Sequence, residues 1–175
     1  MDKTFTFAFS QLYESVARQL SIIGKRSVSD DGKSLFGDIT IGTREKDIVA
    51  DFLINAVVDL TSRFSALITS TQDNAGSGIN KQISITITVP SNWNNALYFP
   101  LEKAMDNYCI NYTLYSWFTV TAPKIAEKYL ADSQNQLVSV VRLIHEKKEP
   151  SAATSNPVDI NTSVAPVTTS TSSNT

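Results

Sequence analysis

The segment KQISITITVP, residues 81–90, constrains the fold more strongly than any other part of the sequence. Aliphatic side chains alternate in it with serine and threonine, at Ile83, Ile85, Ile87 and Val89. A period of two residues predicts a β-strand with one buried face, and Pro90 ends that strand. Because the backbone groups of a strand need hydrogen-bond partners, this strand requires a neighbour. The candidates are residues 67–71, the DITI segment at 38–41, and a second subunit.

Four amphipathic helices account for most of the remaining sequence, since apolar side chains recur in it at spacings of three and four residues. The predicted helices cover residues 9–25, 44–68, 100–118 and 123–147. Thr43 is placed to cap the second helix, and Pro100 suits the first position of the third. The short connection between the last two helices predicts an antiparallel hairpin.

These elements predict a fold that is mostly α. We expect one domain over residues 1–149, a four-helix bundle with a β-strand or hairpin element inserted between the second and third helices at 69–99. Residues 69–80 are expected to form an exposed loop. Residues 150–175 contain twelve serines or threonines, three prolines and one charge. Such a composition buries too little apolar surface to offset the entropy of ordering, so a disordered tail is predicted.

The charge balance argues against a dedicated nucleic-acid binder. The 175 residues carry 15 Lys or Arg and 17 Asp or Glu, which gives a net charge of −2, whereas binding to phosphates relies on many basic side chains. No signal peptide and no membrane-spanning apolar run are evident, so we expect a soluble protein made in the cytoplasm, with no membrane partner. The single cysteine, Cys109, cannot form an internal disulfide and is predicted to be a buried thiol.

The motifs that carry enzyme chemistry are missing from the sequence. The glycine-containing loop at 74–78 lacks the lysine and the following helix of a phosphate-binding loop. The single histidine, His145, sits in a charged run at a helix end, and no cluster of histidines or cysteines offers ligands to a metal. We therefore expect no enzyme, no catalytic residue, no cofactor and no metal, and a binding or structural role is favoured.

The third helix is apolar almost all round, which is unusual. Tyr108, Tyr112 and Tyr115 fall on one stripe that is predicted to face the core. A second set lies on nearly the opposite side: Ile110, Leu114 and Trp117. Either the chain buries this second set under another layer, or another protein chain covers it. Stacking on nucleic-acid bases is disfavoured, because residues 107–120 contain no Lys or Arg.

The hairpin sequence NYCINYTLYSWFTVTAPKIAEKY, residues 107–129, resembles the small head–tail connector proteins (adaptor or head-completion proteins) of tailed bacteriophages, particularly phages of gut bacteria. The pattern aliphatic-Asn-Tyr-x-Leu-Tyr-x-Trp carries the resemblance at 110–117. A Thr-x-Pro turn at 121–123 and Glu-Lys-Tyr at 127–129 follow it. The resemblance extends over residues 9–148.

The resemblance implies a structural protein of the virion. Such proteins form homo-oligomeric rings, typically of about twelve copies, that attach below the portal protein, contact the tail or the next ring, and extend the channel through which double-stranded DNA passes without sequence specificity. The inserted element at 69–99 would then dock a partner. Its strand would pair across subunits by β-augmentation.

The interface hypothesis therefore names two groups of side chains. One is Ile110, Leu114 and Trp117 on the third helix, and the other is Ile83, Ile85, Ile87 and Val89 on the strand. There are two alternatives to a connector. One is another virion or tail-completion component, such as a tail terminator, and the other is a small phage-encoded module with a nucleic-acid-binding or regulatory role.

Overall fold

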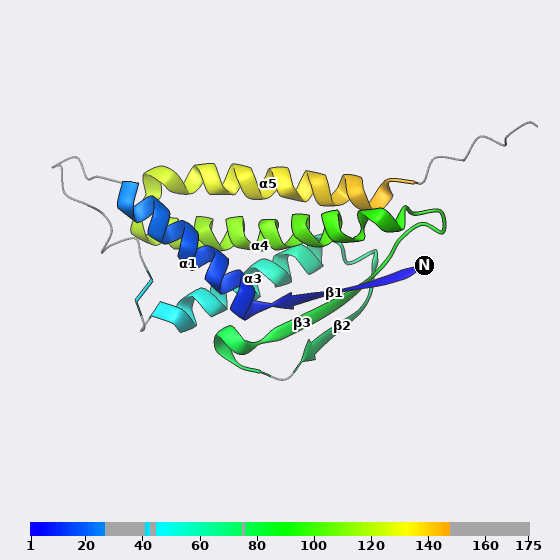
Figure 1. Ribbon diagram of the computed structural model, residues 1–175, viewed down its shortest axis with the longest axis horizontal. Helices are drawn as coiled ribbons and strands as arrows, with labels where there is room; N and C mark the ends of the chain where they lie inside the picture. Colours follow the sequence, from blue (N-terminus) through cyan, green and yellow to red (C-terminus); the bar gives the residue numbers. More distant parts are fainter. Residues whose placement is uncertain (27–40, 43–44, 75, 148–175) are drawn as a thin grey trace, which may run out of the picture.

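The structure is a computed structural model that describes residues 1–26, 41–42, 45–74 and 76–147. Two three-residue 3-10 turns, Gly78–Asn80 and Asn95–Leu97, precede β3 and α4 respectively. The helices and strands follow the order shown in Figure 1: β1 (Asp2–Ala8), α1 (Phe9–Arg26), α3 (Lys46–Arg63), β2 (Ile68–Asn74), β3 (Gln82–Thr88), α4 (Tyr98–Thr121) and α5 (Pro123–His145).

The strand predicted from the alternating isoleucines is β3, and it lies at the centre of a three-stranded antiparallel sheet with the order β1-β3-β2. Phe5 of β1 and Thr71 of β2 both pair with Ile85. Alternation places the apolar side chains of β1 and β3 on one face, where they are buried against the helices. The opposite face carries hydroxyl side chains, and Thr4 and Thr6 bond there to Thr86 and Ser84 at 3.0 and 2.9 Å.

The sequence prediction placed no strand before residue 9, although β1 shows the same period of two. Phe5 and Phe7 are buried, while the alternating residues Thr4 and Thr6 are exposed. The strand runs directly into α1, and the amide of Phe9 donates to the carbonyl of Lys81 at 3.1 Å. No turn residue separates β1 from α1. Because strands are recognised in a sequence partly by the turn residues that bound them, this strand is difficult to predict.

The second neighbour of β3 is β2, so the candidate at residues 67–71 is confirmed and extends to Asn74. Two predictions are wrong as a result: the second helix does not reach residue 68, and residues 69–74 are not loop. The helix ends at Arg63, where Phe64 leaves helical geometry, and the β-branched residues that follow favour a strand. Residues 38–40 of the DITI candidate and the tail from residue 150 lie outside the described residues, and Ile41 is in no strand.

Helix α4 is the central helix of the molecule. Helix α5 packs antiparallel along one side of it, α3 and the sheet lie on the other side, and α1 crosses in front of it (Figure 1). The mostly helical class and the hairpin between the last two helices are confirmed. The four-helix bundle is not confirmed, because the sheet forms a layer of its own and α1 crosses the hairpin obliquely (Figure 1).

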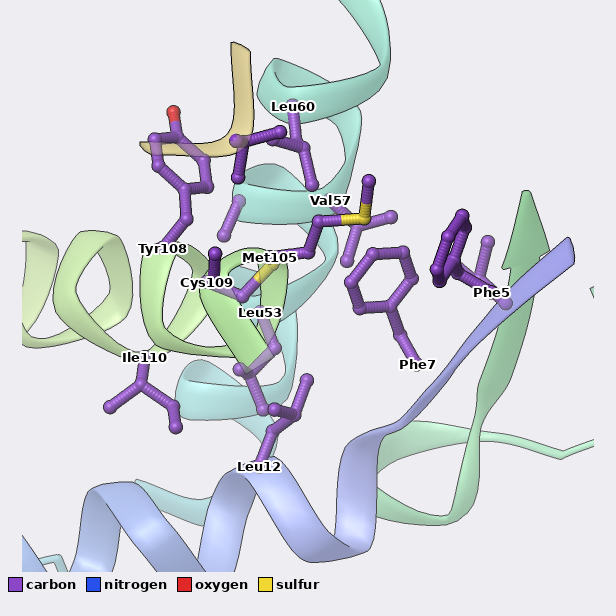
Figure 2. Close-up of a cluster of buried hydrophobic side chains, with 14 of the residues drawn as sticks. Phe5, Phe7, Leu12, Leu53, Val57, Leu60, Met105, Tyr108, Cys109 and Ile110 are labelled. Carbon is purple, nitrogen blue, oxygen red and sulfur yellow. The ribbon is translucent and has the colours of Figure 1, made fainter. Parts of the chain in front are cut away.

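One continuous core joins the sheet to the helices. Figure 2 shows Phe5 and Phe7 pointing from β1 toward side chains of α3 and α4, among them Val57 and Met105. Leu12 of α1 closes the same cluster from below. Over the residues that the structure describes, no helix combines the length and the apolar character needed to cross a membrane.

Candidate interaction surfaces

The second apolar set on α4 is buried within the chain. Ile110 is 7% exposed, Leu114 0% and Trp117 6%. Figure 2 shows Ile110 pointing from α4 toward α1, the helix that crosses this side of the hairpin. Of the two alternatives for this set, burial under another layer of the same chain is the one observed. The interface hypothesis is therefore corrected for these three residues, because their side chains are not free to contact a partner in this conformation.

The same conclusion applies to the strand residues of the interface hypothesis. Ile83, Ile85, Ile87 and Val89 are each at most 7% exposed. Both edges of β3 are hydrogen-bonded, to β1 on one side and to β2 on the other, so β3 has no free edge for β-augmentation. Any strand added to this sheet must pair with β1 or β2 instead.

The outer edge of β1 is partly occupied by α4. Odd-numbered residues of β1 bond to β3, as the reciprocal bonds between Met1 and Val89 show. The backbone groups of even-numbered residues, including Thr4, therefore point away from β3. The hydroxyl of Tyr98 donates to the carbonyl of Thr4 at 2.6 Å, and its ring stacks on Phe5 with centroids 4.8 Å apart.

The outer edge of β2 has no such cover in the described part of the chain. Residues 69–73 are all exposed, on both faces of the strand. Even-numbered residues of β3 bond to β2, as the bond from the Thr88 amide to the Leu67 carbonyl shows at 2.8 Å. The register then turns the backbone groups of Thr71 and Asp73 outward. The sequence hides this strand because, with neither face buried, it lacks alternating apolar residues.

A polar cluster fastens α3 to α4 through Tyr108, the most deeply buried tyrosine of the predicted stripe. Its hydroxyl donates to the carboxylate of Asp59, which also accepts from Arg63 Nε at 2.6 Å. Burial, together with the neighbouring Asp59 carboxylate, raises the pKa of Tyr108. The phenol is therefore a hydrogen-bond donor at neutral pH, which suits a structural contact and not a base.

Asp59 itself has a lowered pKa. Partial burial disfavours its charged form, but hydrogen bonds from Arg63 and Tyr108 outweigh that effect. The rings of Tyr112 and Tyr115 continue from Tyr108 along α4 at centroid separations of 5.9 and 6.2 Å, and both are only partly buried. The predicted core stripe thus begins in the core and ends near the surface.

The lone cysteine lies in the core, as predicted. Cys109 is fully buried in α4, and burial, followed by the nearby carboxylates of Asp106 and Asp59, raises the pKa of its thiol. A thiol of that kind is protonated at neutral pH and unreactive. His145 is exposed at the last residue of α5. No cluster of potential metal ligands occurs among the residues that the structure describes.

Trp93, in the loop before α4, forms a hydrogen bond with the end of α5. Its indole Nε1 donates to the carbonyl of Leu143 at 2.8 Å, and Lys3 Nζ lies 5.9 Å from the centre of its ring. A carbonyl in the last helical turn has no partner within the helix, so this bond satisfies it. Trp93 and Lys147 also form an isolated β-bridge.

Large apolar side chains that remain exposed are distributed over the helices. Those of the described helices are Ile22 on α1, Ile48 and Val58 on α3, Phe99 and Val120 on α4, and Val138 and Val141 on α5. The pair on α5 is the closest in sequence: Val138 is 68% exposed and Val141 43%, one helical turn apart. We call the side of α5 that bears Val138 and Val141 the α5 outer face.

Comparison with known proteins gives no match: no protein-family model, no curated protein and no solved structure is significantly similar to the chain.

Proposed function

We propose that the chain is a structural protein of a bacteriophage virion, a head–tail connector that forms a ring between the portal and the tail and extends the DNA channel. The hairpin sequence carries this proposal. Its pattern at 110–117 lies in α4, and the Thr-x-Pro turn at 121–123 spans the junction to α5. Ile110, Leu114 and Trp117 of the pattern are core positions, so the resemblance concerns the way α4 packs within the chain.

The ring contacts must come from surfaces other than those the sequence indicated, because the two predicted groups are core residues. The α5 outer face is the best remaining candidate in this proposal. Helix α5 lies on the side of α4 away from the sheet (Figure 1), and its residues Val138 and Val141 are exposed. A ring needs a heterologous contact, in which this face meets a different surface of the next copy.

The decisive experiment measures the assembly. Light scattering after size-exclusion chromatography and negative-stain electron microscopy would be applied to the purified full chain, alone and co-expressed with a phage portal protein. We expect a closed ring in at least one of the two samples. A chain that stays monomeric and does not bind the portal would contradict the proposal, and a salt-dependent shift of DNA by that monomer would favour a nucleic-acid-binding module instead.

A further inference from the structure

Strand β2 presents an exposed edge to which another strand can be added. We propose that this edge binds a second copy of the chain, β2 to β2 and antiparallel, with the two-fold axis at Thr71. One continuous sheet would then extend across both copies. This inference concerns a contact other than the ring contact, and it does not depend on the proposed function.

The backbone of β2 supplies the first part of the argument. Ser70, Gln72 and Asn74 pair with Thr86, Ser84 and Gln82 of β3. The amide and carbonyl of Thr71, which lies between the first two, therefore point away from β3, and so do those of Asp73, in a stretch whose residues 69–73 are all exposed. Exposed backbone groups on an edge strand are a template for a further strand. Their donors and acceptors are satisfied when a strand of opposite direction lies alongside.

The second part concerns which strand fits. Another copy offers two outer edges, those of β1 and β2. On β1 the Tyr98 hydroxyl already occupies the carbonyl of Thr4, and the ring of Tyr98 stacks on Phe5 beside that edge. Pairing β2 with a neighbour's β1 would displace Tyr98. The β2 edge of the second copy requires no such displacement, so the contact between copies is of the isologous type.

Charge disfavours the register centred on Asp73. With the two-fold axis at Thr71, Asp73 of the other copy lies beside residue 69, where the register of β2 shifts and the threonine hydroxyl donates to the carbonyl of Thr86 at 3.3 Å. No like charge then meets the Asp73 carboxylate. The two Asp73 side chains then lie at opposite ends of the contact. With the axis at Asp73 the two carboxylates would face each other directly, which is destabilising. Lys81 Nζ, 2.9 Å from Asp73 Oδ2, further neutralises the acidic end within each copy.

The side chains of β2 suit the same register. In this sheet the hydroxyls of neighbouring strands already bond across the exposed face, from Thr4 to Thr86 and from Thr6 to Ser84. The register at Thr71 sets Ser70 opposite Gln72 of the second copy, so an amide and a hydroxyl meet on that face. Paired polar side chains of this kind stabilise a sheet by a small amount each.

Cysteine cross-linking tests the contact and the register together. Opposed residues of a hydrogen-bonded antiparallel pair have Cα atoms about 5.5 Å apart, which a disulfide can span. We expect Thr71→Cys to form a covalent dimer on mild oxidation. The matched variant Gln72→Cys, one residue away, should form little, because its opposite residue is Ser70. The native Cys109 is fully buried and contributes no background.

Absence of a cross-linked dimer for Thr71→Cys overturns the proposal, and so does preferential cross-linking of Gln72→Cys. A second measurement uses Thr71→Pro, which removes one outward amide and no hydrogen bond to β3. The particle mass of Thr71→Pro, measured by light scattering, should be half that of Thr71→Val, which retains the amide. The ratio should hold whether or not the chains also assemble through ring contacts. Equal masses for the two folded variants would contradict the contact. A missing ring with an intact Thr71 cross-link would count against the proposed function alone.

Discussion

The hydroxyl of Tyr98 donates a hydrogen bond of 2.6 Å to the backbone carbonyl of Thr4. This contact joins residues 94 positions apart and places the first turn of α4 against the outer edge of β1. The stacked ring of Phe5 holds Tyr98 in position. A side chain of the last helical hairpin thus covers one edge of the sheet, while no described residue covers the other edge, that of β2.

Removing that hydroxyl tests its role. Tyr98→Phe keeps the stacked ring and leaves the Thr4 carbonyl without its donor, so we expect the free energy of unfolding to fall by about 0.5–1.5 kcal/mol. Urea denaturation followed by circular dichroism would measure the change. Tyr115→Phe is the matched control, since Tyr115 lies in the same helix and its hydroxyl forms no hydrogen bond within the described residues. Equal losses in the two variants would refute the edge-capping role.

The sheet shows what sequence patterns can and cannot predict. Strand β3 was predicted correctly because its isoleucines alternate and face the core. Residues 67–71 were only one of three candidate partners, and 69–74 were expected to be loop, because both faces of β2 meet solvent and its sequence ITSTQDN has no apolar period. The strand order is a tertiary property: β1 and β3 pair across more than seventy residues, as the bond between Thr6 and Ser84 illustrates. No local pattern encodes that pairing.

Helix α4 shows the same limit for the candidate site. Its apolar residues on all sides predicted burial or a partner, and the pattern alone did not distinguish a neighbouring helix from a neighbouring chain. The answer depends on the path of α1, which crosses α4 and covers Ile110. The sequence contained little indication of a contact surface on α5, because Val138 and Val141 lie in a helix whose pattern is otherwise amphipathic.

The core position of Leu114 leads to a prediction about stability. Its side chain is fully buried, so Leu114→Ala removes contacts and leaves a cavity, which should lower the free energy of unfolding by about 2–5 kcal/mol. Val138→Ala, on the exposed α5 outer face, should change it by less than about 0.5 kcal/mol. Chemical denaturation of both variants checks this. If Leu114→Ala instead left stability intact and only weakened assembly, the interface hypothesis would be restored for this side of α4.

The Asp59 contacts predict a dependence of stability on pH. Its pKa is lowered in the folded chain, despite partial burial, by bonds from Arg63 and Tyr108. The stabilisation is therefore present above the unfolded-state pKa of about 4 and is lost as the pH falls through the lower folded-state value. Asp59→Asn should be less stable than the native chain at pH 7, and the difference should shrink toward pH 3. Urea denaturation at both pH values measures it.

The control for that experiment is Asp51→Asn, which changes an exposed carboxylate on the same helix. In Asp51→Asn the free energy of unfolding should change between pH 7 and pH 3 by nearly the same amount as in the native chain. Because the Asp59 side chain is partly solvated, we expect a modest effect. A difference between the native chain and Asp59→Asn that stays constant from pH 7 to pH 3 would show that the carboxylate charge does not contribute.

Trp93 provides a prediction about local dynamics. Trp93→Phe keeps an aromatic ring in a buried position but removes the donor to the Leu143 carbonyl. We expect a loss of about 1–3 kcal/mol in the free energy of unfolding, together with faster amide hydrogen exchange in the last turns of α5. Lys3→Gln removes only the ammonium group near the ring and should have a smaller effect. Unchanged exchange near Leu143 in Trp93→Phe would contradict the fastening role.

The α5 outer face gives the sharpest test of the ring proposal. The double variant Val138→Glu and Val141→Glu places two charges on exposed positions, so the fold should be retained, with little change in thermal unfolding. Burying those charges at a subunit contact would be costly, and we expect the ring to dissociate into smaller species. Light scattering and electron microscopy measure the assembly. Val58→Glu, at an exposed valine on α3, is the matched control and should still assemble. If the double variant still forms the ring, the subunit contact does not involve Val138 and Val141.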